Sequence, residues 1–360
     1  MAAFISFQPK DVMNTTIWDG NGTNPRTFTD VGFQPDMTTI KCRDSAQYFY
    51  GYDSLRTPGV NNEISFNLDT GQGASGGTTG YMSAFTANGF TVTEGSSNDN
   101  VVNDGSLDYA AWSWKAGTTS GISGGTITPS AYSINTSSKF GIYKYTGTGS
   151  TGTIAHGLGS VPNFVLIKRT DGTEGWLAGH SYTTEGDGND WGSGFEFNTD
   201  GASVNAPSYF NDTDPTSTLI TVGDNAKCNQ SGYEYIMYAW CNVPGYARFG
   251  LYQGDGNTNG PFINLGFRPN LVIIKEITYS RSWVMFSEPI LRWNVNNHRV
   301  HANSSAAFVT NDSDQIDMCA TGFTLRKGGG QTNPSSGNAI YMAWAKNPMV
   351  SSNDVPGVAR

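Results

Sequence analysis

The sequence predicts an all-β protein made of three tandem antiparallel β-sandwich domains of jelly-roll type. Charged residues make up only 14% of the chain, whereas 45 of its 360 residues are glycine and 12% are aromatic. Glycine-rich turns between short apolar or aromatic runs are typical of β structure. No window of about 11 residues or more places apolar side chains at helical spacing. We therefore expect helix to be almost absent.

An internal repeat divides this β protein into three parts. A strand-like run ending in lysine occupies residues 36–41, 163–168 and 270–275, and it follows a proline each time. An aromatic residue with a Gly-x-Gly turn lies upstream of each proline. All three markers shift by 127 residues and then by 107, which indicates three related units of domain size. The markers are Trp18, Tyr145 and Tyr252; Pro35, Pro162 and Pro269; and Lys41, Lys168 and Lys275.

The order of elements is clearest in the first copy. After the glycine turn come the lysine strand, an aromatic strand at 47–50 and a long polar loop, and then two closing strands at 89–93 and 108–115. Period-2 alternation in the closing strands predicts half-buried β structure. In the second copy, residues 219–223 lack the Gly-Phe pair of this pattern, which leaves its fourth strand in doubt.

The predicted domain boundaries follow from these elements. Each copy should close its own core, so that the protein consists of separate domains that follow one another along the chain. The linker is rich in Gly, Ser and Thr and should be flexible or extended, and the polar tail should be frayed or docked on a partner. The domains are repeat 1 at 1–117, a linker at 118–138, repeat 2 at 139–244, repeat 3 at 245–347 and the tail at 348–360.

Aromatic residues fall into repeated and non-repeated sets. The repeated ones are interpreted as core anchors of each sandwich. Aromatics that do not repeat lie in variable loops, where platforms that stack on sugars are better sought. The repeated set is Phe49, Trp176 and Trp283 with Trp114, Trp240 and Trp344, and the non-repeated candidates are Trp191, Trp293 and Tyr209.

Charge and hydropathy exclude several partners. The formal net charge of −9 opposes binding to a phosphate backbone, and no basic cluster offsets it, so nucleic acid is not expected. No apolar run approaches 18 residues, and the N-terminus lacks the pattern of a signal peptide. We expect a soluble protein made in a cytoplasm, without membrane insertion.

The cysteines do not form a repeated framework. Cys42, Cys228, Cys241 and Cys319 fall at non-equivalent positions of the copies. Four free thiols are the favoured interpretation, and a bridge between Cys228 and Cys241 is the alternative.

Several segments match motifs of cofactor or metal binding, but the residues around them do not predict the structure that such sites need. Residues 147–152 match the dinucleotide fingerprint by letter, but no helix can follow, so a hairpin turn is predicted instead. Acidic clusters at 185–190, 211–214 and 311–314 are interpreted as solvated turns, with a structural calcium site as the alternative. His298 and His301 would point to opposite faces of a strand. His156 and His180 complete a set too small to suggest a metalloenzyme, so no catalytic residue, cofactor or metal is predicted.

The first copy resembles a repeat family that is abundant in tailed phages, especially marine ones. The resemblance rests on residues 32–36, 40–45, 88–91 and 111–117, with related patterns at 156–162 and 243–246. It implies a virion structural protein of tail fibres or related appendages, and it brings no catalytic residues.

The expected function is therefore that of a non-enzymatic virion protein, a homo-oligomer that contacts other virion proteins and a host surface glycan or protein. Recognition should use the segments where the copies diverge, at 55–79, 180–207 and 287–311. A capsid decoration or tail connector with a purely structural role is the alternative. An enzymatic reading would make the protein a polysaccharide depolymerase, since carboxylate pairs meet only in the fold.

Overall fold

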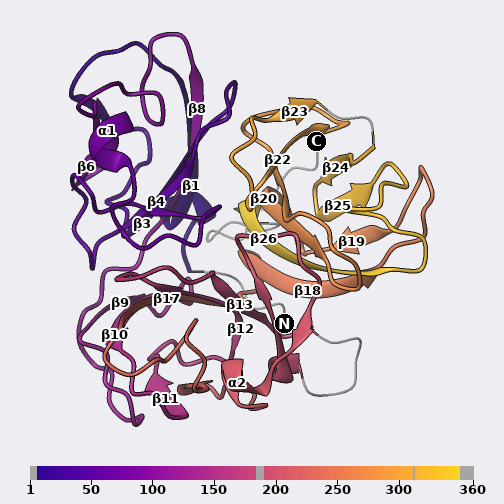
Figure 1. Cartoon of the computed structure of the whole chain (residues 1–360). Helices are drawn as coiled ribbons and strands as arrows, with labels where there is room; N and C mark the ends of the chain where they lie inside the picture. Colours follow the sequence, from indigo (N-terminus) through magenta and orange to yellow (C-terminus); the bar gives the residue numbers. More distant parts are fainter. Residues whose placement is uncertain (1–5, 184–189, 311–312, 349–360) are drawn as a thin grey trace.

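The computed structural model describes residues 6–183, 190–310 and 313–348. Strands make up 42% of the chain and helices 4%, and the strands form several antiparallel sheets, which confirms the all-β prediction. The sheets group into three pairs, each with one large and one small sheet (Figure 1). We name these pairs unit 1 (residues 13–114), unit 2 (131–241) and unit 3 (247–348). The short helices are η1 (Pro9–Asp11), α1 (Gly76–Thr79), η2 (Asp190–Gly192) and α2 (Pro207–Phe210).

Unit 1 contains a five-stranded and a three-stranded sheet. The large sheet has the order β1-β8-β3-β4-β5 and the small one β2-β7-β6. Its strands are β1 (Met13–Asp19), β2 (Arg26–Phe28), β3 (Met37–Cys42), β4 (Phe49–Asp53), β5 (Ile64–Ser65), β6 (Tyr81–Thr86), β7 (Gly89–Thr93) and β8 (Asp108–Trp114).

Unit 2 follows with a seven-stranded and a two-stranded sheet. The large sheet has the order β15-β14-β13-β12-β17-β10-β9, and the small one pairs β11 with β16. Its strands are β9 (Ala131–Asn135), β10 (Phe140–Thr146), β11 (Gly152–Ala155), β12 (Pro162–Arg169), β13 (Leu177–His180), β14 (Ser193–Glu196), β15 (Val204–Asn205), β16 (Leu219–Val222) and β17 (Glu234–Cys241).

Unit 3 has a six-stranded and a three-stranded sheet. The orders are β18-β26-β20-β21-β22-β23 and β19-β25-β24. Its strands are β18 (Ala247–Gln253), β19 (Phe262–Asn264), β20 (Phe267–Glu276), β21 (Val284–Ser287), β22 (His298–His301), β23 (Val309–Thr310), β24 (Ile316–Cys319), β25 (Gly322–Leu325) and β26 (Asn338–Pro348).

Corresponding strands occupy corresponding places in the three large sheets. In each large sheet the last strand of the unit pairs on one side with the strand that carries the marker lysine, β3, β12 or β20, and on the other side with β1, β10 or β18. Lys41, Lys168 and Lys275 lie on β3, β12 and β20. The shared sequence markers therefore coincide with a shared strand order.

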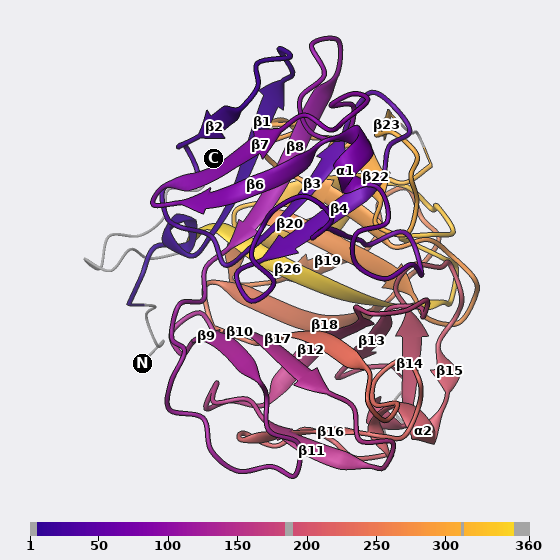
Figure 2. The same ribbon diagram turned by 60° about the vertical axis from the view of Figure 1, so that its left-hand side comes forward.

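The large sheets are buried on both faces, and β8 shows how. Tyr109 and Ala111 face the small sheet of their own unit, in a cluster with Phe90 of β7. Trp112 and Trp114 belong instead to a cluster that contains residues of all three units. Alternating side chains of one strand therefore supply two cores. Figure 2 shows the small sheets β2-β7-β6 and β11-β16 on the outside of the molecule.

Three equivalent tryptophans meet where the large sheets converge. The ring centroids of Trp114 and Trp344 are 5.5 Å apart, those of Trp240 and Trp344 6.0 Å, and those of Trp114 and Trp240 6.2 Å. Each side chain is at most 5% exposed. Units 1 and 2 each have a core of their own, but the expectation that the copies pack as separate bodies is wrong, because these anchors form a further core that joins all three units.

The segment at 118–138, predicted as a flexible or extended linker, contains a strand that sequence reasoning missed. Strand β9 pairs with β10, and Ile127 and Ile134 are buried in the core of unit 2. Ser133 donates a hydrogen bond to Asp36 of unit 1 at 3.0 Å. The segment therefore ties two units together.

The structure also tests three smaller predictions. Residues 147–152 connect β10 to β11, which lie in different sheets, so the turn is not the hairpin we predicted, although no helix follows it. Residues 219–222 do form a strand, β16, which resolves the doubt about them. Strand β26 extends to Pro348, and the rest of the predicted tail lies outside the described residues.

Candidate functional site

The three repeated lysines link the units into a closed ring of contacts. Each is fully buried, and burial lowers the pKa of each amine to about 8. Each ammonium donates to one carbonyl of its own unit and to one of another unit, so each lysine joins two units. The acceptors are Gln47 and Ser305 for Lys41, Glu174 and Asp69 for Lys168, and Glu276 and Asp200 for Lys275, at 2.6–3.5 Å.

The three divergent segments, predicted as recognition loops, supply the other half of these contacts. Phe66 of the first segment stacks on Trp176 of unit 2 at 4.4 Å. Phe197 of the second lies 4.7 Å from Trp283 of unit 3, and Phe308 of the third lies 6.4 Å from Trp112 of unit 1. Large parts of these segments therefore hold the scaffold together.

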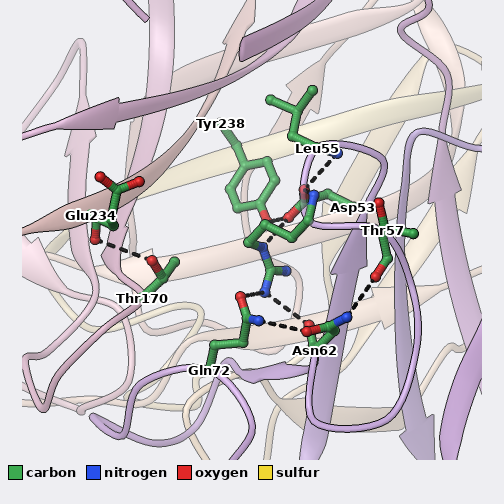
Figure 3. A network of polar contacts seen from close by, with 9 residues as sticks. Asp53, Leu55, Thr57, Asn62, Gln72, Thr170, Glu234 and Tyr238 are labelled. Carbon is green, nitrogen blue, oxygen red and sulfur yellow. Dashed lines mark hydrogen bonds and ion pairs between the residues drawn. The ribbon is translucent and has the colours of Figure 1, made fainter. Parts of the chain in front are cut away.

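A buried polar network lies between units 1 and 2 (Figure 3). Asp53 at the end of β4 accepts hydrogen bonds from Arg56 Nε and from the hydroxyl of Tyr238, each at 2.7 Å. The side chains of Asp53 and Arg56 are 0% and 3% exposed. Arg56 Nη1 also donates to the carbonyl of Asn62 and to Gln72 Oε1. One ion pair thereby fixes both the first divergent segment and the contact with unit 2.

The electrostatics of this network keep Arg56 charged and Tyr238 neutral. Burial acts against the charged guanidinium, but Asp53 and Tyr238 outweigh it and raise the pKa of Arg56. Burial and the Asp53 carboxylate raise the pKa of the Tyr238 hydroxyl well above its usual value. The tyrosine therefore stays a neutral donor, and the arrangement stabilises an interface instead of activating a nucleophile.

The three aromatic residues proposed as sugar platforms differ in how exposed their side chains are. Trp191 and Tyr209 are 2% and 7% exposed and pack in the core of unit 2, so their predicted exposure is wrong. They lie in η2 and α2 and share this cluster with Ile154 of β11 and Ile220 of β16, so these short helices complete the core next to the two-stranded sheet. Trp293 is 69% exposed. It is the only one of the three that can meet a ligand.

The loop that carries Trp293 is fixed on both sides. Asn294 uses its side-chain amide to donate to the carbonyl of Met318 at 3.1 Å and to accept from the Met318 N–H at 2.9 Å. Asn296 is fully buried and exchanges two backbone hydrogen bonds with Ile316. Leu291 is buried on the other side. We call residues 291–296 the Trp293 loop.

Charged groups next to this loop are mostly basic. Arg268 Nη1 donates to the same Met318 carbonyl as Asn294, at 3.2 Å. Its Nη2 lies 3.4 Å from Glu288, whose other oxygen lies 2.6 Å from Lys346 Nζ. Arg292 is exposed in the loop itself. Arg292 thus lies in the loop, and a group of two cations and one carboxylate reaches the loop through the Met318 carbonyl. The net charge of the whole chain is −9.

The histidines have structural surroundings. His156 is buried, with Nδ1 accepting from the Leu158 N–H at 3.2 Å. His298 and His301 begin and end β22, so they lie on one strand at a spacing of three. His180 lies at the boundary of units 2 and 3, against Phe249. Within the part of the chain that the structure describes, no three His, Cys, Asp or Glu side chains gather closely enough to hold a metal ion.

His180 should make the protein sensitive to acid. Burial lowers its pKa from 6.5 to about 3, so only the unfolded chain takes up a proton as the pH falls through this window. Its contribution to stability is fully present above pH 6.5 and is lost toward pH 3. In urea denaturation between pH 7 and 4.5, we expect His180→Gln to remove up to about 1.4 kcal/mol per pH unit of this dependence.

The control for this prediction is His298→Gln, because His298 is only partly buried. It should change the pH dependence less than His180→Gln. A His180→Gln variant that loses stability on acidification as steeply as the wild-type protein would contradict the prediction.

The acidic turns and the cysteines complete the set of sequence candidates. Asn211 and Asp212 have positive φ angles of 56° and 46° in the turn after α2. Asp314 is buried and lies 3.3 Å from Arg299 Nη2, so it is an ion-pair partner and not a solvated turn residue. Residues 185–189 and 311–312 lie outside the described residues. All four cysteines are free, as favoured from their positions.

Comparison with known proteins places the chain in a family. The model of DUF7483, a domain of unknown function, matches residues 8–348, and the chain belongs to this family. One match thus spans all three units. No curated protein and no solved structure matches the chain. Among the described residues, no helix has the length and apolar character needed to cross a membrane.

Proposed function

We propose that this chain is a non-enzymatic virion protein of a phage tail fibre or tail appendage, and that it attaches the particle to a host surface through the Trp293 loop. The observation that carries the proposal is the 69% exposure of Trp293 on a loop anchored by Asn294 and Asn296. A large exposed indole on a rigid loop binds a partner with little loss of conformational entropy. Tryptophan and arginine are also the residues most enriched among binding hot spots.

The resemblance of the sequence to phage repeats supports the virion setting. The three-unit scaffold supports binding over catalysis, because its buried Lys41, Asp53 and Arg56 are engaged in contacts between or within units. A rigid β scaffold with a fixed loop is a common way to present a recognition surface.

A connector role within the virion is the second candidate, and the closed ring of contacts favours it. Units 1, 2 and 3 contact one another in cyclic order through equivalent lysines. Such an arrangement can seat on a partner with threefold symmetry, since equivalent surfaces recur around the ring.

Host binding separates the two candidates. Purified protein should bind susceptible cells and compete with phage adsorption, and replacing residues 292–295 by a Gly/Ser segment should abolish both effects. Circular dichroism should stay unchanged, because these four side chains are exposed. Normal adsorption of phage carrying the replaced loop would reject the attachment role and leave the connector.

A further inference from the structure

We propose that the Trp293 loop binds a saccharide that carries a negative charge, such as a uronic acid residue of a host surface polysaccharide. This inference rests on the proposed function and adds the class of ligand. The indole of Trp293 offers a flat apolar face, which suits the C–H face of a pyranose ring. Its exposure of 69% leaves that face accessible.

The charge of the ligand follows from the surroundings of the loop. Arg292 is exposed, and Arg268 reaches the same Met318 carbonyl as Asn294 of the loop. Glu288 is 5% exposed and is shared between Arg268 and Lys346, so one carboxylate faces two cations. The cations therefore exceed the carboxylate by two when Arg292 is counted.

This local excess contrasts with the rest of the molecule. With a net charge of −9, the chain as a whole repels anions. A local excess of cations at a loop with an exposed aromatic side chain therefore favours an anionic ligand at this loop. Guanidinium groups bind carboxylates with two parallel hydrogen bonds, which would orient the charged substituent of the sugar.

Loop rigidity explains how a small surface could bind usefully. Asn294 holds both backbone groups of Met318, and Asn296 donates to the carbonyls of Ser287 and Leu291 at 3.4 Å. The loop backbone therefore does not need to be ordered on binding, which removes one cost that weakens single-sugar contacts.

The test compares tetragalacturonate with tetragalactose of the same linkage by calorimetry on the full chain, together with an array of neutral, carboxylated and phosphorylated glycans. We expect the wild-type protein to bind anionic glycans more tightly than neutral ones, and more weakly as salt rises. The array arms distinguish a carboxylate from a phosphate as the source of the charge.

Variants assign the binding to the loop. Trp293→Ala should weaken binding of the anionic probe by about tenfold or more, and Arg292→Gln by about three- to tenfold without affecting a neutral probe. The matched controls are Tyr279→Ala, an aromatic that is 60% exposed at the other end of the β20–β21 hairpin, and Lys10→Gln, an exposed cation of η1. Neither should change binding.

Failure of this inference can be told apart from failure of the proposed function. Absence of binding to every anionic glycan, or equal affinity of Trp293→Ala and wild-type protein, would overturn the inference. If cells are still bound in that case and the loop replacement abolishes it, attachment stands and the ligand class is wrong. If cells are not bound either, the attachment role fails as well.

Discussion

Replacing Trp240 by alanine is expected to lower the free energy of unfolding by about 3–5 kcal/mol, the usual cost of truncating a buried large aromatic side chain. The loss should not stay within unit 2. Trp240 contacts Trp114 of unit 1 and Trp344 of unit 3, so the cavity opens at the place where all three large sheets meet. The chain should therefore unfold as one cooperative body.

Guanidinium denaturation followed by native-state hydrogen exchange tests this expectation. Amides of β8 and β26 should lose protection along with those of β17, because the side chain supports all three strands. Trp293→Ala is the matched control and should change the free energy of unfolding by less than about 0.5 kcal/mol, as expected for an exposed position. If β8 and β26 of the Trp240 variant kept their hydrogen-exchange protection, the three units would unfold as independent domains and the expectation would be wrong.

The strands could be predicted from the sequence because their signals are local. The offsets of Lys41, Lys168 and Lys275 located equivalent strands, and alternation identified β7 and β8. What lies against each face could not be predicted in this way. Alternation between Tyr109 and Trp112 says that the two side chains point apart, but both faces are apolar, and the partner of the second face belongs to another unit.

The role of the divergent segments was missed for a related reason. Phe66, Phe197 and Phe308 each reach another unit, yet they share no fixed offset from the sequence markers. A contact between segments separated by more than 80 residues leaves no periodic trace in a single sequence. Low apolar content also hid β9, where Ile134 is buried between polar neighbours.

The candidate site was predicted only in part. Trp293 was among three non-repeated aromatics, and sequence alone could not say which of them is exposed. Trp191 and Tyr209 belong to a buried cluster that includes residues of β11 and β16, whereas Trp293 is 69% exposed. Such packing against segments distant in the chain leaves no local signal in the sequence. Arg268 comes from β20, and only the fold brings it to the Met318 carbonyl that Asn294 of the loop also contacts.

Removing the buried carboxylate of Asp53 should be the other large effect. Asp53→Ala leaves Arg56 charged, 3% exposed and without its carboxylate, and breaking such a buried pair costs about 3–5 kcal/mol. The Tyr238 hydroxyl also loses its acceptor, so the contact between units 1 and 2 should loosen. Tyr238→Phe alone should cost less, on the order of 1–2 kcal/mol, because it removes a single hydrogen bond.

A double-mutant cycle of Asp53→Ala with Tyr238→Phe measures this link between the units by urea denaturation. We expect a coupling energy of about 1 kcal/mol or more, since the two side chains share a hydrogen bond of 2.7 Å across the interface. Lys144→Met provides the control, because its ion pair with Glu234 lies on the surface, with both side chains about one third exposed, and should contribute less than about 1 kcal/mol. Additive effects of Asp53→Ala and Tyr238→Phe would mean that the network stabilises unit 1 alone and that the apolar contacts, chiefly Phe66 on Trp176, hold unit 2 in place.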